Sequence, residues 1–505
     1  MAVINADGGD LMPGETAQTL WVKVKSTFSE TNLPLVVLTL LGALLRLYHL
    51  GFKALWFDEA VIYWISKGST LSEILSLNAT QNSAPILFTT LTSFMLNFGE
   101  TEFVLRLIPW LAGVISIPVI YFLARKFVSQ YPAFICAILV ALAPMQVRYS
   151  QELREYSLTF LLATLILLFF TMYIQKNKLK YLVFMTGCMV LGMFTQYGLA
   201  VLIIGVNICF LINWLANKDR AAKIILMWGI AQLVVLGAAI AVYFTSLSDH
   251  LTPGWGADSS ANYLSTNYWS GGFPSLLHFI WSKSLGLFEF AFPKPVFIQL
   301  ILLGLIVLMV DRRHKMALLM FVAPMLLTVL LSMIQYYPYG GIRQDIFLTP
   351  MIYILIGIGV SRIIEFDKSR LVVTLLLFFM VVNGLYLSWH VVNQNSVENL
   401  RPIVAKLQKS YQPGEKIYVY YAAYPAFSYY YKNETEMWVI GTRNREEITN
   451  YYAEIDAALA SNNPVWMVFS HCFAEECELI PEYVSKDHQL QLKAHDTDAF
   501  LYYVP

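Results

Sequence analysis

Residues 33–60 read LPLVVLTLLGALLRLYHLGFKALWFDEA, an apolar run followed by an acidic pair, Asp58-Glu59. A helix needs about 20 apolar residues to cross the hydrocarbon core of a membrane. The run at 33–50 leads into Arg46 rather than into a small-residue cleavage site, so it predicts a retained first transmembrane helix. The acidic pair then lies just outside that helix.

The composition of the whole chain also indicates a membrane protein. Of its 505 residues, 57% are hydrophobic and only 13% are charged, whereas soluble domains usually carry about a quarter charged residues. Residues 392–505 hold 9 Lys and Arg against 15 Asp and Glu, which leaves 25 against 19 for residues 1–391. This split predicts a basic membrane domain and an acidic soluble domain, and we expect no nucleic-acid partner.

Ten further apolar runs complete a prediction of eleven spans. They lie at 103–124, 131–147, 155–174, 179–195, 197–216, 221–244, 296–311, 315–335, 346–363 and 371–391. The shorter run at 84–98 contains several polar residues and is predicted to lie flat on the membrane as an amphipathic helix. With this assignment all clusters of Lys and Arg face the cytoplasm, as the positive-inside rule requires. The N-terminus is then cytoplasmic and the C-terminus extracytoplasmic.

We therefore predict an α-helical polytopic membrane protein in three parts. These are a cytoplasmic tail at 1–32, a transmembrane catalytic domain at 33–391 and an extracytoplasmic α/β domain at 392–505. The outer face carries the segments 51–102, 148–154, 245–295 and 336–345, together with the soluble domain. Because the inner loops are short, we expect the chemistry on the outer face.

The soluble domain alternates helical and strand patterns. Strands are predicted at Lys416–Tyr421, Val465–Phe469 and Ala499–Val504, and helices at Glu398–Lys409 and Asn444–Ala460. It has no phosphate-binding glycine loop, so we expect it to cap the site or to recruit an acceptor.

Two cysteines lie close together in this domain, at Cys472 and Cys477. An extracytoplasmic location would allow a disulfide between them. We favour it over a zinc site with His471, because no second pair of ligands has zinc spacing.

Asp58 and Glu59 are the first candidates for function, because carboxylates near a bilayer surface are costly and often functional. Helix capping is the competing explanation, since Asp is a good N-cap residue. Neighbouring residues of a helix project about 100° apart. One carboxylate can therefore face a cavity while the other forms a pair or a cap.

Two further outer loops are dense in polar groups. Residues 148–156 read RYSQELREY and contain Glu152, Arg154 and Tyr156. A solvated turn with internal ion pairs is the simpler explanation of this loop. Residues 336–345 read YYPYGGIRQD and contain Tyr339 and Arg343. A lone arginine between tyrosines is either an interfacial anchor or a phosphate ligand, since guanidinium presents its donors in a fixed fork.

These segments together resemble a known family. The resemblance is carried by Arg46-Leu47, Leu55–Ala60, Ala84-Pro85, Glu102–Pro109, Ala143-Pro144 and Tyr149–Tyr156. In this order they are similar to the protein O-mannosyltransferase-like membrane glycosyltransferases, the GT-C fold group that includes the bacterial aminoarabinose transferases. The resemblance covers roughly residues 33–395. It departs where Ser83-Ala84-Pro85 replaces a His-Pro-Pro type signature, and the C-terminal domain is not the trefoil domain of the eukaryotic protein mannosyltransferases.

The resemblance implies a sugar donor linked to a polyprenyl phosphate, with transfer at the extracytoplasmic face and inversion at the anomeric carbon. It places the catalytic carboxylate at Asp58, and Glu59, which matches the second member of the family's acidic pair, is a catalytic candidate as well. Donor phosphate and sugar binding are expected at Glu152, Arg154, Tyr156, Arg343 and Tyr339. No cofactor or metal ion is expected to be required, because such a donor lacks the diphosphate of a nucleotide sugar. The expected location is a bacterial plasma membrane, with a lipid, a glycan or a protein as acceptor.

Three other functions compete with this one. A transporter would place polar residues near the middle of the membrane, often on broken helices in inverted repeats. A polymerase or ligase of lipid-linked polysaccharide would share the topology and the donor. A non-catalytic assembly subunit would tolerate Asp58→Asn in an activity assay.

Overall fold

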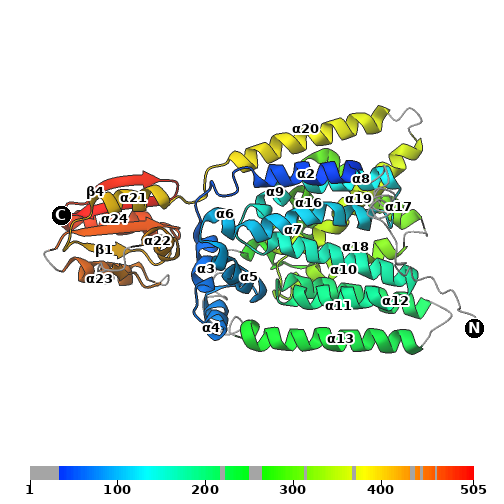
Figure 1. Ribbon diagram of the computed structural model, residues 1–505, viewed down its shortest axis with the longest axis horizontal. Helices are drawn as coiled ribbons and strands as arrows, with labels where there is room; N and C mark the ends of the chain where they lie inside the picture. The colour runs from blue at the N-terminus through cyan, green and yellow to red at the C-terminus, as the bar shows by residue number, and fades with distance from the viewer. Residues whose placement is uncertain are drawn as a thin grey trace, which may run out of the picture.

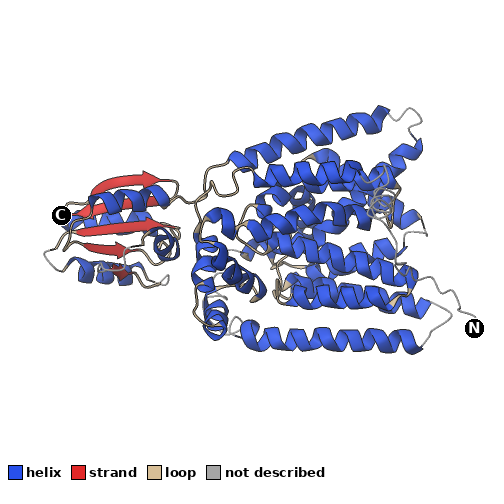
Figure 2. Ribbon diagram, in the orientation of Figure 1, coloured by secondary structure: helices blue, strands red, loops and turns tan. Residues whose placement is uncertain are grey.

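The computed structural model describes residues 33–216, 222–248, 264–311, 315–366, 371–432, 438–443, 447–460 and 463–505. Long helices form one body, and a small α/β domain stands at one end of it (Figure 1). Figure 2 shows that the strands of the described chain are confined to this small domain. The predicted tail at 1–32 lies outside the described residues.

Within the described residues, seven helices are long and apolar enough to cross a membrane. They are α7 (Leu107–Ala124), α10 (Tyr156–Lys176), α12 (Gly198–Ala216), α13 (Ala222–Val242) with its π-helical extension η2 (Tyr243–Leu247), α18 (Lys315–Met333), α19 (Thr349–Phe366) with the preceding 3-10 turn η5 (Arg343–Leu348), and α20 (Leu371–Asn393). The chain is therefore a multi-pass membrane protein.

Two bent helix pairs supply two more spans by the same measure. These pairs are α8 (Gln130–Leu142) with α9 (Pro144–Ser150), bent by 53°, and α16 (Phe273–Ala291) with α17 (Pro295–Val310), bent by 112°. The remaining two predicted spans are occupied by the 15-residue helices α2 (Leu33–Leu47) and α11 (Leu179–Met193), each about 22 Å long. One expectation was wrong: part of the predicted 245–295 loop is helix α16. The polar residues of this helix interrupt its apolar sequence, so the sequence predicted a loop.

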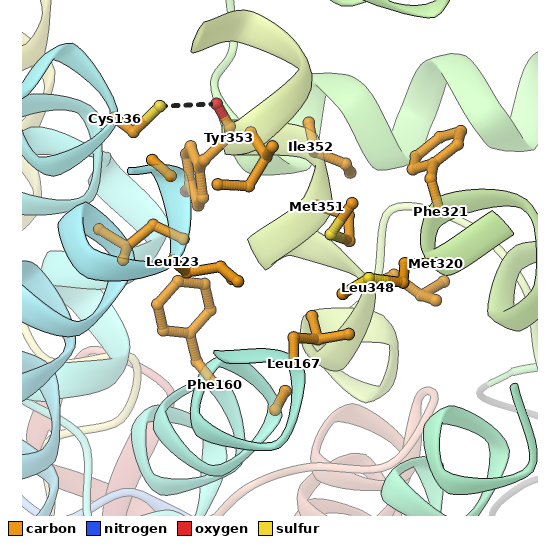
Figure 3. Close-up of a cluster of buried hydrophobic side chains, with 14 of the residues drawn as sticks. Leu123, Cys136, Phe160, Leu167, Met320, Phe321, Leu348, Met351, Ile352 and Tyr353 are labelled. Carbon is orange, nitrogen blue, oxygen red and sulfur yellow. Dashed lines mark hydrogen bonds between the residues drawn. The ribbon is translucent and has the colours of Figure 1, made fainter. Parts of the chain in front are cut away.

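Large apolar side chains from several spans meet in the middle of the bundle. Figure 3 shows Leu123, Phe160 and Leu167 facing residues of α18 and α19, and Cys136 Sγ lies 3.2 Å from the carbonyl oxygen of Tyr353. Helices α17 and α19 approach closely because a glycine faces the neighbouring backbone: a Cβ on Gly304 would lie 2.2 Å from a carbonyl oxygen of α19. Small residues at helix contacts are typical of membrane bundles.

A buried arginine in α2 satisfies the backbone carbonyls at the break between α8 and α9. Pro144 has no backbone N–H, so the carbonyl of Val140 loses its usual helical donor. Arg46 Nη2 donates to that carbonyl at 2.7 Å, and Nη1 donates to the carbonyl of Ala141 at 2.8 Å. Its Nε donates to Ser150 Oγ in α9 at 3.1 Å. The arginine thereby ties α2 to both halves of the bent span.

Short helices fill the space between the bundle and the small domain (Figure 1). They are α3 (Phe57–Ser66), α4 (Leu71–Gln81), α5 (Leu87–Met95) with η1 (Leu96–Phe98), and α6 (Glu102–Leu105). The predicted flat helix at 84–98 is α5 with η1, which packs beside α3 instead of continuing through the bundle. Helix α4 begins at the cap residue Thr70, whose Oγ1 accepts a hydrogen bond from the backbone N–H of Glu73.

The C-terminal domain is a five-stranded mixed sheet with strand order β2-β1-β3-β5-β4. Its strands are β1 (Lys416–Val419), β2 (Trp438–Ile440), β3 (Val465–Ser470), β4 (Gln491–Asp496) and β5 (Ala499–Val504), and its helices are α21 (Arg401–Ser410), α22 (Tyr424–Tyr430), α23 (Ile448–Leu459) and α24 (Glu476–Asp487). Strand β3 is central and wholly buried, parallel to β1 and antiparallel to β5. The three predicted strands and both predicted helices are present. A disulfide joins Cys472 to Cys477, as favoured from the sequence.

Candidate active site

Asp58 lies in the first turn of α3, at the end of the bundle that faces the C-terminal domain. The helix begins at Phe57, and its cap residue Trp56 makes no side-chain capping bond. The Asp58 carboxylate instead faces two arginines: Oδ2 lies 2.8 Å from Arg343 Nη1 and 3.8 Å from Arg154 Nη1. The side chain of Asp58 is 18% exposed and that of Arg343 is 20% exposed. The site is therefore enclosed but accessible.

The loop before α19 sets the position of Arg343. The backbone N–H of Gly340 donates to Asp345 Oδ2 at 2.7 Å, which closes the loop. Gly341 packs directly on helix α16, because a Cβ there would lie 2.2 Å from the carbonyl oxygen of Gly286. The guanidinium carbon of Arg343 lies 5.6 Å from the centroid of the Trp56 ring, a distance at which a cation interacts favourably with an aromatic face.

The loop between α9 and α10 supplies the second arginine. Arg154 Nε lies 3.1 Å from Glu155 Oε2, and its Nη2 lies 3.5 Å from the hydroxyl of Tyr156. The ring of Tyr156 also lies 5.6 Å below the guanidinium of Arg343. The simpler explanation of this loop is thus partly right, because internal ion pairs do form. They hold Arg154 against Asp58 rather than leaving the loop solvated.

Glu59 points away from Asp58 and makes a separate, fully buried ion pair. Arg106 donates to both of its carboxylate oxygens, from Nε at 2.8 Å and from Nη2 at 2.6 Å. Oε1 also accepts the backbone N–H of Leu153 at 2.6 Å. Glu59 therefore links α3 to the start of α7 and to the loop that carries Arg154.

The charges around Asp58 favour its ionised form. Burial raises the pKa of Asp58, but the charges of Arg343 and Arg154 outweigh that effect and hold the pKa below its usual range. Glu152 behaves in the opposite way. Burial raises its pKa to about 7, although Arg148, 3.6 Å away, lowers it. The two arginines of the site are therefore shared between Asp58, which both of them face, and Glu155, which pairs with Arg154.

Tyr339, like Glu59, makes contacts other than those with Asp58, Arg343 and Arg154. Its ring is fully buried, and its hydroxyl lies 2.7 Å from Ser284 Oγ of α16. Within the described ranges, no group of three or more His, Cys, Asp or Glu side chains is arranged to hold a metal ion.

Sequence reasoning assigned no role to Trp56 or to Arg106 as the partner of Glu59. Trp56 precedes the acidic pair directly, and this adjacency was the available signal. Arg106 gave no signal of pairing, because 47 positions separate it from Glu59.

The architecture matches that of known membrane glycosyltransferases. ArnT from Cupriavidus metallidurans bound to undecaprenyl phosphate superposes with a TM-score of 0.58 at 15% identity, covering 93% of this chain and 97% of that one. The fold is the GT-C fold of the ArnT type. The Archaeoglobus fulgidus oligosaccharyltransferase tethered to an acceptor peptide gives a TM-score of 0.54 at 11% identity, over 94% of this chain and 74% of that one.

A second structure of the archaeal enzyme is AglB in complex with an inhibitory peptide and a dolichol-phosphate. It gives a TM-score of 0.53 at 11% identity, over 93% of this chain and 74% of that one. Residues 82–244 match the family model of dolichyl-phosphate-mannose-protein mannosyltransferases. The match contains Glu152, Arg154 and Tyr156 and leaves Asp58 and Arg343 outside. No curated protein sequence matches the chain significantly.

Proposed function

We propose that the chain transfers a sugar from a polyprenyl-phosphate donor to an acceptor hydroxyl, with inversion, at the extracytoplasmic face of a bacterial plasma membrane. The observation that carries the proposal is the contact of Asp58 with Arg343 and Arg154 at the bundle end beside the soluble domain. The GT-C fold and the undecaprenyl phosphate in the ArnT structure support the class of donor.

Asp58 is proposed as the general base. A hydroxyl is a weak nucleophile, and a carboxylate within hydrogen-bond reach can take its proton as the new bond forms. The acceptor oxygen bonds to the anomeric carbon while the bond from that carbon to the phosphate oxygen breaks. The proton passes to Asp58, and polyprenyl phosphate leaves with its added negative charge.

Arg343 and Arg154 are proposed to bind the donor phosphate. A guanidinium fork matches phosphate geometry, and in an enclosed site it stabilises the charge that develops on the leaving group. In the free protein these arginines face Asp58 instead. A bound phosphate would share them, so the pKa of Asp58 would rise toward its usual value and the carboxylate would become a stronger base.

No resident metal ion or cofactor is part of this proposal, since Asp58 supplies a base and Arg343 and Arg154 supply two phosphate ligands. Glu152 is assigned to orienting the loop that carries Arg154, and Glu59 to fixing α3 through Arg106. Tyr156 and Trp56 flank the guanidinium of Arg343, where their rings also offer flat surfaces for a sugar.

The proposal is tested with purified protein and a panel of polyprenyl-phosphate sugars, offered with lipid, glycan and peptide acceptors. Release of polyprenyl phosphate is the measurement. Arg343→Ala should lower the rate at least a hundredfold, whereas the matched change Arg362→Ala, at an exposed arginine of α19 paired with Glu365, should not. No release with any donor by the wild-type protein would refute the proposal.

The orientation is tested separately by labelling a cysteine introduced at Ser72 in α4. An impermeant reagent added outside the cell should label it. Labelling from the cytoplasmic side alone would place the site on the opposite face.

A further inference from the structure

The C-terminal domain contacts the helix that carries Asp58 at several points, among them Tyr429 against Tyr63 and Tyr424 against Trp64. One histidine and one glutamate hold the first turn of that helix. His471 follows strand β3, and its Nδ1 lies 2.5 Å from Glu398 Oε1. The other oxygen of this carboxylate, Oε2, accepts the backbone N–H of Phe57 at 3.0 Å. The imidazole stacks on the Phe57 ring, with centroids 4.2 Å apart and planes 9° apart. Phe57 begins α3 and immediately precedes Asp58.

The same few residues of the first loop are held along their backbone. Three of the four backbone N–H groups at positions 54–57 donate to side chains of the C-terminal domain or its linker: Ala54 to Ser396 Oγ at 2.8 Å, Leu55 to the Tyr430 hydroxyl at 2.9 Å, and Phe57 to Glu398 Oε2 at 3.0 Å. The segment leading into α3 is therefore shaped by a domain more than 300 positions away in the chain.

His471 occupies an uncommon backbone conformation. Its φ is +53°, in the left-handed region that only a few per cent of non-glycine residues adopt, with Asn, Asp and His enriched among them. The disulfide begins at the next residue, Cys472, and Asp498 accepts backbone hydrogen bonds from both His471 and Cys472. A strained residue that its surroundings fix in this way is a reason to look for a functional role.

We propose that His471 and Glu398 are positioning residues for Asp58. Together they fix the first turn of α3, so that the Asp58 carboxylate meets Arg343 and Arg154 in one geometry. The C-terminal domain thereby becomes part of the active site without touching the substrate. We call His471 and Glu398 the clamp. The role of Asp58 as a base rests on the proposed function, whereas the contacts of the clamp with α3 do not.

The charge on the imidazole gives the clamp a pH dependence. The groups that face His471 are the carboxylates of Glu398, Asp58 and Asp498 and the uncharged Phe57 ring. Burial lowers the pKa of His471, but the hydrogen bond and charge of Glu398, with the two aspartates, raise it above its usual value. The charged clamp is therefore present at low pH and is lost as the pH rises through this raised pKa. An alkaline decline in activity should follow.

His471→Asn is the test variant, because Asn tolerates a positive φ and keeps an N–H donor near Glu398 while losing the ring and the charge. His495→Asn is the matched control, at an exposed histidine of β4 whose ring lies 4.8 Å from that of Phe500 at an interplanar angle of 35°. His471→Asn should lower kcat on the order of ten- to a hundredfold, leave KM for the donor unchanged and remove the alkaline decline. His495→Asn should do none of these.

A second variant and a second readout separate this proposal from the proposed function. Glu398→Gln keeps the imidazole but cannot accept from both donors, so it should lower kcat in the same way. Hydrogen–deuterium exchange of the peptide at 54–62, in lipid nanodiscs, should speed up in both variants and not in His495→Asn. This readout needs no substrate, so it stands even if no donor is turned over. Unchanged exchange, or faster exchange with wild-type kcat and pH profile, would overturn the proposal.

Discussion

Replacing Arg106 with methionine should destabilise the protein strongly without touching the proposed catalytic base. Arg106 and Glu59 form an ion pair in which each side chain is only 2% exposed. Arg106 Nη1 also donates to the backbone carbonyls of Leu50 at 3.0 Å and Lys53 at 2.9 Å. Methionine fills similar volume but leaves the Glu59 charge and these carbonyls without their donor.

The expected loss in the free energy of unfolding is about 3–5 kcal/mol, the usual cost of breaking a buried ion pair from one side. Glu59→Gln should cost a similar amount, because it leaves the arginine charge unpaired. The double variant removes both charges, so its loss should be at least about 2 kcal/mol smaller than the sum of the single losses. An exposed pair behaves differently: Arg362→Met, in the pair with Glu365, should cost less than about 1 kcal/mol.

The free energies can be measured by SDS titration in mixed micelles, followed by tryptophan fluorescence. The turnover of folded Glu59→Gln is then compared with that of wild type. Losses that add within about 0.5 kcal/mol would show that the two residues are not coupled. A folded but inactive Glu59→Gln would mean that Glu59 takes part in the chemistry, and the separation of roles between Asp58 and Glu59 would be wrong.

Three further predictions concern groups that shape the site. Burial raises the pKa of Glu152 from 4.5 to about 7, so between these values the folded protein holds a proton that the unfolded chain releases, and the stability of wild type falls as the pH rises. The free energy of unfolding of Glu152→Gln, relative to that of wild type, should therefore increase by about 2–3 kcal/mol from pH 5 to pH 8. A difference that stays constant with pH would refute this. Gly341→Ala should raise KM for the donor and lower the free energy of unfolding by about 1–3 kcal/mol. Gly286→Ala is the control and should be tolerated, because a Cβ there meets its nearest atom at 3.6 Å. Equal effects of the two changes would contradict the proposed packing. Arg46→Met should cost at least about 2 kcal/mol in SDS titration, because it strips the donors from the Val140 and Ala141 carbonyls, and wild-type stability would contradict its assigned role.

Much of the membrane fold could be predicted, because apolar runs and loop charges are local properties of the sequence. Prediction failed where a helix mixes its signals. Helix α16 carries His278, Lys283 and Glu289 among aromatic residues. Its sequence is therefore similar to that expected of a loop on the membrane surface. In the C-terminal domain, the side chains of β4 are exposed or half-exposed, so this strand lacks the buried pattern that is typical of β3.

The candidate site was predictable in its members more than in its contacts. The 100° offset between neighbouring helical residues correctly predicted that Asp58 and Glu59 would face different surroundings. Which surroundings they face depends on pairs distant in the chain, such as Asp58 with Arg343, and no local pattern records these. The role of His471 was out of reach for the same reason, since Glu398 and Phe57 meet it only after the two domains dock.

The central claim is that Asp58 takes the proton of the acceptor. The most direct test is the rate of polyprenyl phosphate release by Asp58→Asn, beside wild type and the matched control Asp487→Asn at an exposed position of α24. Asp58→Asn should bind the donor but turn over at least about a hundredfold more slowly at every pH from 5 to 9, while Asp487→Asn keeps the wild-type rate. Turnover by Asp58→Asn within a few-fold of wild type would contradict the account.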